Sequence, residues 1–335
     1  MLQLPPILLG TFCPTGICGY PPSQDFVIST KPEELTNYLP SNWNENIFYR
    51  TLHYTNKGVH VILYKDVTTL LDSATPKPLL FLINNETPAI SEINILLSQL
   101  YVIDAFLFFN TNHLTYVDIN LYSPTEPMLR KFGCMFYGNM YMPAINNTIW
   151  NVGDYIMSLA KLHNELMYFC PLNDKVRGNV VGHYSNATLT LMRNNHFNVP
   201  FRNMLIGPML LSGDLFAIVY AHIIIKRVAK GFLRRYLFRE NNEDLWIEVE
   251  TDLKNMLTML ESVPCGPVIT NVLVNDSRLN RSNSRILNVE IQYSNAGTFS
   301  SFASGPHAGP GGLTIPPIGG YMGTINVQVA MPRTA

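Results

Sequence analysis

The chain has 335 residues, of which 47% are hydrophobic and only 14% are charged, and its formal net charge is −1. Soluble domains usually carry about 25% charged residues, so we expect much of the surface to face other subunits. A near-neutral charge argues against a protein whose whole surface follows nucleic acid. The abundance of apolar and aromatic residues argues against disorder over most of the length.

The chain offers no good match to a membrane or export signal. The first residues, MLQLPPILLGTF, lack a basic stretch, and Pro5 and Pro6 interrupt their apolar run. The longest apolar run, Leu215 to Ile225, is shorter than the roughly 20 residues that cross a bilayer. We therefore expect a soluble chain that is not exported through a signal peptide and has no stable membrane insertion.

The cysteines show no recognisable pattern. They form no CxxC pair and no Cys/His spacing typical of a metal site, which predicts reduced thiols in a cytosolic protein. The five residues are Cys13, Cys18, Cys134, Cys170 and Cys265.

The first 130 residues alternate between strand and helix patterns. Short strands separated by turns are expected over 7–30, followed by a short helix over 31–39, a second helix over 44–58 and a strand over 59–65. Two continuous apolar runs of strand length, 78–84 and 104–110, flank a helical pattern at 91–102. Buried-type strands alternating with helices predict parallel pairing in an α/β layer.

The middle of the chain has a weaker pattern. Helical spacing predicts a helix over 154–169, whereas the Asn-rich stretch 187–208 favours loop or strand over helix. From residue 212 the pattern sharpens again. Ser212 or Asp214 can cap a long helix, which a Glu-Asn-Asn segment ends near residue 240.

A second helix, two strands and a tail follow. Apolar residues from Trp246 to Leu260 recur at helical spacing, and alternating strands are expected over 267–276 and 285–294. The tail is rich in Gly, Pro and Ser, which predicts an extended linker. It ends in an alternating strand made of Thr324, Ile325, Asn326, Val327, Gln328, Val329, Ala330 and Met331.

A strand at the end of a flexible arm suits pairing with the sheet edge of a neighbouring subunit. Pairing with a sheet of its own chain is an equally open alternative.

No motif with a chemical mechanism is present. The sequence lacks a Walker loop, HExxH, GxSxG and an acidic metal run, and the glycine-rich stretch 305–312 neither follows a strand nor opens a helix. We therefore expect no enzyme activity, no catalytic residues, no cofactor and no metal site.

Basic and acidic residues adjoin each other around residue 240. A group of cations lies along the end of the first long helix, where it complements the helix dipole, and a group of acids follows it. The cations are Lys226, Arg227, Lys230, Arg234, Arg235 and Arg239; the acids are Glu240, Glu243, Asp244, Glu248, Glu250 and Asp252. This pattern favours ion pairing within the chain or between identical neighbours. A nucleic-acid patch or a membrane edge fits it less well.

The order of the elements resembles that of contractile tail sheath proteins of bacteriophages and related injection machines. Residues 227–294 are similar to the family's C-terminal domain, in which a basic helix, a Phe-x-x-Asn turn, a Trp-led helix, a Gly turn and two strands follow one another. These features fall on Phe238, Asn241, Trp246, Gly266 and Asp276. Residues 7–39 and 48–65 are similar to the family's early segment.

The resemblance implies a mixed α/β fold in three parts. These are an N-terminal sheath-like α/β region over 1–205, a C-terminal domain over 206–298 and an arm over 299–335. Only MLQLPP precedes the first strand, where family members carry an N-terminal arm, so a reduced sheath or a sheath-like ring protein remains open.

The resemblance also implies a function. A structural subunit would polymerise in stacked rings of identical copies around an inner tail tube, and would contract to drive that tube through a host envelope for genome ejection. Baseplate and tail terminator proteins would be further partners, Arg234, Arg235 and Arg239 would contact the tube or another subunit, and no direct nucleic-acid contact is expected. The expected location is the virion tail, after assembly in the host bacterial cytoplasm. The alternative is a static tail terminator or baseplate ring protein.

Overall fold

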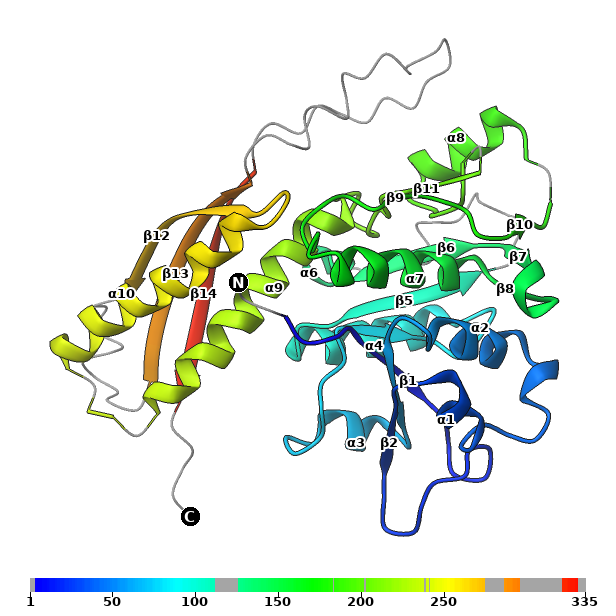
Figure 1. Ribbon diagram of the computed structural model, residues 1–335, viewed down its shortest axis with the longest axis horizontal. Coiled ribbons are helices and arrows are strands. Elements are labelled where there is room, and N and C mark those ends of the chain that lie inside the picture. Colours follow the sequence, from blue (N-terminus) through cyan, green and yellow to red (C-terminus); the bar gives the residue numbers. More distant parts are fainter. Residues whose placement is uncertain are drawn as a thin grey trace. The chain divides into compact units, whose positions relative to one another are not determined.

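The computed structural model describes residues 4–111, 126–182, 184–201, 203–237, 239–240, 242–274, 286–295 and 321–330. The chain forms two compact units. The larger unit contains Pro5–Glu165 and Leu172–Phe216, and the smaller unit contains Met1–Leu4, Leu166–Pro171 and Ala217–Ala335. The fold is mixed α/β, as the sequence predicts (Figure 1).

A six-stranded sheet forms the centre of the larger unit, in the order β2-β3-β1-β4-β5-β6. β1 pairs in parallel with β3 and β4, β5 joins β4 and β6 in parallel, and only β2 is antiparallel to its neighbour. The strands are β1 (Leu8–Phe12), β2 (Phe26–Ser29), β3 (His60–Tyr64), β4 (Leu80–Leu82), β5 (Phe106–Thr111) and β6 (Gly133–Tyr137). β4, β5 and β6 are buried at every position, which is why their sequences read as continuous apolar runs. The predicted parallel α/β layer is confirmed.

Helices pack on this sheet through apolar stripes. α4 contacts β5, whereas α7 contacts β5 and β6 and also packs against α2. α4 buries Ile93, Leu96, Leu97 and Leu100, which recur at helical spacing. The helices are α1 (Pro32–Thr36), η1 (Trp43–Glu45), α2 (Ile47–Thr55), α3 (Val67–Leu71), α4 (Ile90–Val102), α6 (Pro127–Arg130) and α7 (Asn151–Asn164).

Two small sheets and one helix complete the larger unit. β7 (Asn139–Met142) lies between β10 (Asn179–Val180) and β8 (Asn147–Trp150), and η3 (Pro143–Ile145) connects β7 to β8. β9 (Asn173–Lys175) pairs with β11 (Met204–Ile206). α8 (Asn186–Asn194) is a helix within the stretch for which the sequence favours loop or strand. The expectation is wrong there because the Ser185 hydroxyl caps the helix, accepting from Thr188 N at 3.1 Å.

The smaller unit combines two long helices with a three-stranded antiparallel sheet. Its helical elements are α9 (Phe216–Leu233), η4 (Arg234–Tyr236), α10 (Glu243–Thr258) and η5 (Met259–Ser262). Its strands are β12 (Pro267–Val274), β13 (Ile286–Asn295) and β14 (Tyr321–Ala330), in the order β12-β13-β14. α10 packs on β12 (Figure 1). It buries Leu245, Val249, Leu253, Met256 and Leu257.

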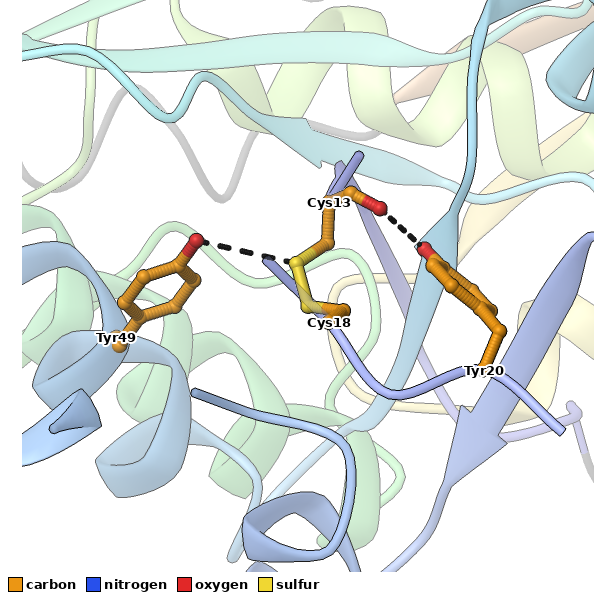
Figure 2. Close-up of a disulfide and its surroundings, with 4 residues drawn as sticks. All are labelled: Cys13, Cys18, Tyr20 and Tyr49. Carbon is orange, nitrogen blue, oxygen red and sulfur yellow. Dashed lines mark hydrogen bonds between the residues drawn. A yellow bond between two sulfur atoms is a disulfide. The ribbon is translucent and has the colours of Figure 1, made fainter. Parts of the chain in front are cut away.

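Four of the five cysteines are paired, so the expectation of reduced thiols is wrong for them. Cys13 bonds to Cys18 and Cys170 bonds to Cys265, while Cys134 remains a buried thiol. Figure 2 shows the first pair, with the Tyr49 hydroxyl 3.8 Å from Cys13 Sγ and the Tyr20 hydroxyl donating to Cys13 O at 2.7 Å. Pairing requires Cα atoms about 4.4–6.8 Å apart. The fold supplies separations of 5.8 and 5.1 Å, which spacing along the sequence does not reveal.

Candidate subunit interface

The predicted C-terminal strand is present and pairs with β13 of its own chain. The antiparallel register runs from Ile286 opposite Ala330 to Asn295 opposite Tyr321. Within the single chain the open alternative, pairing with its own sheet, is therefore the one observed. Met331 lies outside the described residues, as does most of the linker predicted over 297–323. Residues 321–323 of that linker are instead part of β14.

The strand divides its side chains between two faces. Ile325, Val327 and Val329 are buried, whereas Thr324, Asn326 and Gln328 are exposed. This alternation with period two is what the sequence pattern predicts for a half-buried strand. β14 is at the end of the strand order, so no other described strand of this chain pairs with its outer edge.

Gly323 fixes the register of this pairing. It lies opposite Tyr293, and a Cβ atom at Gly323 would collide with the Tyr293 ring. The Tyr293 hydroxyl in turn lies 3.1 Å from Nδ1 of His222 on α9. A shift of one residue would place a side chain on the ring, so only one alignment of β14 fits.

Two of the three predicted interface arginines form ion pairs inside the smaller unit. Arg235 Nη2 lies 2.7 Å from Asp252 Oδ2, and its guanidinium centre lies 3.6 Å from the centroid of the Phe232 ring. Arg239 binds both carboxylate oxygens of Glu248, at 2.6 and 2.7 Å. The hydrogen bond from Arg239 lowers the pKa of the Glu248 carboxyl. Both acids belong to the acidic group that follows the basic helix end.

Arg234 differs from its neighbours. It is exposed, and among the described residues it forms no ion pair. Of the three predicted contact residues, it therefore keeps its charge available to another molecule.

The family-like features at the start of α10 are partly described. The Asn242 side chain caps the helix by accepting from Leu245 N at 3.0 Å, and Trp246 is half-buried in the first turns. At Gly266 a Cβ atom would collide with the Leu260 carbonyl oxygen, which explains the glycine. Phe238, Asn241 and Asp276 lie outside the described residues.

A charged cluster in the larger unit has no counterpart in the sequence analysis. The Asp154 carboxylate is fully buried and accepts from the Arg177 backbone N–H at 2.9 Å and from Arg177 Nη1 at 2.8 Å. Arg177 also binds Asp174 at 2.9 Å. Asp154 and Arg177 are 23 positions apart in the sequence, so no local pattern reveals this pair.

Cofactor and metal chemistry find little support in the described residues. They contain no group of three or more His, Cys, Asp or Glu side chains able to hold a metal ion. A hollow of about 540 Å³ beside β2 and α3 is lined by Tyr38, Thr68 and Asp72 among others, and its described lining has no histidine, lysine or cysteine. The lining therefore contains no pair of a nucleophile and a histidine or lysine base. No described helix is long and apolar enough to cross a membrane.

Comparison by sequence finds no matching protein-family model and no matching curated protein. Comparison with solved structures finds 11 similar chains, among them chains of the following three assemblies. The anti-feeding prophage baseplate aligns with a TM-score of 0.60 at 12% identity, covering 85% of this chain and 88% of the other. The contracted helical sheath of the same prophage gives 0.59 at 14%, covering 86% and 89%. The contracted sheath complex of the extracellular contractile injection system PVC gives 0.63 at 11%, covering 87% and 88%.

These alignments span most of both chains. The chain therefore has a sheath-like α/β fold, and the resemblance seen in the sequence is confirmed at the level of the fold.

Proposed function

We propose that this protein is a structural subunit of a contractile tail or injection system, that it polymerises in stacked rings around an inner tube, and that it contracts to drive the tube forward. The observation that carries the proposal is the match over 85–87% of the chain to sheath and baseplate proteins. The role is structural and not enzymatic. Location in a particle tail, after assembly in the cytoplasm of a bacterial host, belongs to the same proposal.

In the assembly, β14 pairs with β13 of a neighbouring subunit. The single chain supports this step because it contains both halves of the pairing, a strand edge on β13 and a matching strand β14. Identical chains can exchange such an element at little cost, since the same contacts form between subunits as within one. The strand exchange joins neighbours while they move.

Arg234, Arg235 and Arg239 lie on the surface that meets the tube or another subunit. Arg234 is the strongest of these candidates because it is exposed and its charge is unpaired among the described residues. Arg235 and Arg239 would contribute to this surface as ion pairs with Asp252 and Glu248.

Engineered cysteines distinguish exchange from pairing within one chain. Gln292 and Thr324 lie directly opposite each other on β13 and β14. Opposed residues in an antiparallel pair have Cα atoms about 4.5–5.5 Å apart, within reach of a disulfide. The double variant Gln292→Cys/Thr324→Cys, assembled and then oxidised, should run as a ladder of covalent multimers on a non-reducing gel.

A monomeric cross-linked band from assembled particles would refute strand exchange. Gln292→Cys/Gln328→Cys is the matched control, because Gln328 lies opposite Asn288 and is out of reach. It should give no ladder.

The second candidate is a static baseplate or terminator ring, which the match to the prophage baseplate favours. Electron microscopy of the purified protein separates the two. Open-ended tubes that shorten on triggering support the sheath, and closed rings that never extend support the static ring.

A further inference from the structure

The disulfide between Cys170 and Cys265 attaches a short segment to the rest of the smaller unit. Cys170 lies in the segment Leu166–Pro171, which belongs to the smaller unit, whereas Glu165 before it and Leu172 after it belong to the larger one. The segment is anchored by Tyr168 and Phe169, which are 3% and 1% exposed. The disulfide adds a covalent bond to this apolar anchor.

Cys265 lies in a turn and is the more exposed of the two bonded cysteines. Cys265 has a φ of 58°, a left-handed conformation that a non-glycine residue adopts at a cost. The turn around it is held by the hydrogen bond from Gly266 N to Val263 O at 2.9 Å. Cys265 is half-buried, whereas its partner Cys170 is only 8% exposed. Of the two cysteines, Cys265 is therefore the one that a reagent from solvent should reach first.

The other cysteines are much less accessible. Cys13 and Cys18 are 0% and 5% exposed. Cys134 is fully buried, accepts from Asn198 Nδ2 at 3.2 Å, and has a thiol pKa raised by that burial. Because exchange depends on access and on thiolate character, these three should react slowly in the folded protein.

We propose that the Cys170–Cys265 bond is a redox switch that fastens the segment 166–171, opened and closed by exchange with small thiols of the glutathione class. On opening, a glutathione thiolate attacks Cys265 Sγ, the S–S bond breaks, and Cys170 leaves as a thiolate. A second glutathione thiolate attacks the glutathione sulfur of the mixed disulfide. The protein disulfide is reduced to two thiols and two glutathiones are oxidised to one disulfide.

Closing is the reverse reaction: oxidised glutathione accepts the two electrons, and the two glutathione thiolates that leave take up the protons that the cysteine thiols lose. In a reducing cytosol the segment would be held by its apolar contacts alone. After transfer to an oxidising medium the covalent bond would fasten it. The switch concerns the attachment of one segment and does not depend on the proposed function.

The experiment exposes the purified full chain to reduced glutathione under argon, followed by acid quench, alkylation and peptide mass spectrometry. Cys170 and Cys265 should become alkylated at least about tenfold faster than Cys13 and Cys18, and Cys134 should stay unlabelled until denaturant is added. Equal rates for the two pairs, or faster loss of Cys13–Cys18, would overturn the proposal.

Hydrogen exchange then tests the consequence of opening. Reduction should accelerate amide exchange in 166–171 by at least about tenfold, because a crosslink between residues 95 apart in sequence no longer restricts the opened state. Oxidised glutathione should restore the slow rate. Unchanged exchange after complete reduction of this pair would refute the fastening role.

Two variants localise the effect. Cys13→Ser/Cys18→Ser should retain the redox response of 166–171, whereas Cys170→Ser/Cys265→Ser should exchange quickly under all conditions. If the latter variant fails to fold, the comparison of oxidised with reduced wild-type protein still decides the question.

Discussion

Removal of β14 should destabilise the smaller unit itself, and a peptide supplied in solution should restore it. A chain that ends at residue 312 lacks Ile325, Val327 and Val329, which are 1%, 1% and 8% exposed in the intact sheet. Burying an aliphatic side chain of this size stabilises a protein by about 1.5–3 kcal/mol. The three together contribute roughly 5–9 kcal/mol, comparable with the whole stability of many domains.

Hydrogen exchange measured by mass spectrometry reports this loss locally. In the truncated chain the amides of β12, β13 and α10 should lose protection, while those of β3 to β6 in the larger unit keep theirs. Adding a peptide of residues 313–335 should restore protection in a saturable way. The same peptide carrying Val327→Asp is the control and should not bind, because it would bury an unpaired carboxylate.

The reasoning fails if truncation leaves protection of β12 and β13 unchanged. It also fails if the wild-type and Val327→Asp peptides restore protection equally. The first outcome would mean that β14 contributes nothing to the sheet. The second would mean that its buried face does not determine binding.

Three further changes test the packing. Gly323→Ala should cost about 1–3 kcal/mol in thermal denaturation because its methyl group meets the Tyr293 ring, and adding Tyr293→Ala should remove the clash between them. Asp154→Ala should cost about 1.5–3 kcal/mol in urea unfolding because Arg177 loses a buried carboxylate that accepts from its backbone N–H and from Nη1, although it keeps Asp174 as a partner. Adding Arg177→Met should recover part of that loss, which simple additivity would contradict. Burial lowers the pKa of His163 from 6.5 to about 4. As the pH falls from 6.5 to 4, the unfolded state therefore takes up a proton that the folded state does not bind, and the free energy of unfolding should fall by about 3 kcal/mol. His163→Gln should flatten that part of the pH–stability curve, and an unchanged slope would exclude His163 as its source.

Five of the six strands of the main sheet, β1 to β5, overlap strands predicted from the sequence, whereas no strand was predicted for β6. β4 and β5 are buried on both faces, so their residues alone reveal the element. α10 was equally visible, since its buried residues recur at helical spacing. Each of these elements could be predicted because the apolar residues within the segment itself are enough to identify it.

Other features depended on contacts distant in sequence. The Cys170–Cys265 bond and the Asp154–Arg177 pair join residues 95 and 23 positions apart, which no local window contains. For β14 the sequence predicted the strand but left its partner open, because alternation fixes which face is buried and not which edge is paired. Arg234 could be singled out only once the partners of Arg235 and Arg239 were known.

The discontinuity of the smaller unit sets an order of events during synthesis. Tyr168 and Phe169 leave the ribosome about 150 residues before β14 begins at Tyr321. At about 5–20 residues per second, that separation corresponds to roughly 8–30 s. During this interval two large aromatic side chains lack part of the unit in which they are later buried, and the larger unit is itself complete only once Phe216 has been made. Newly made chains should therefore depend on a chaperone at this stage more than completed chains do.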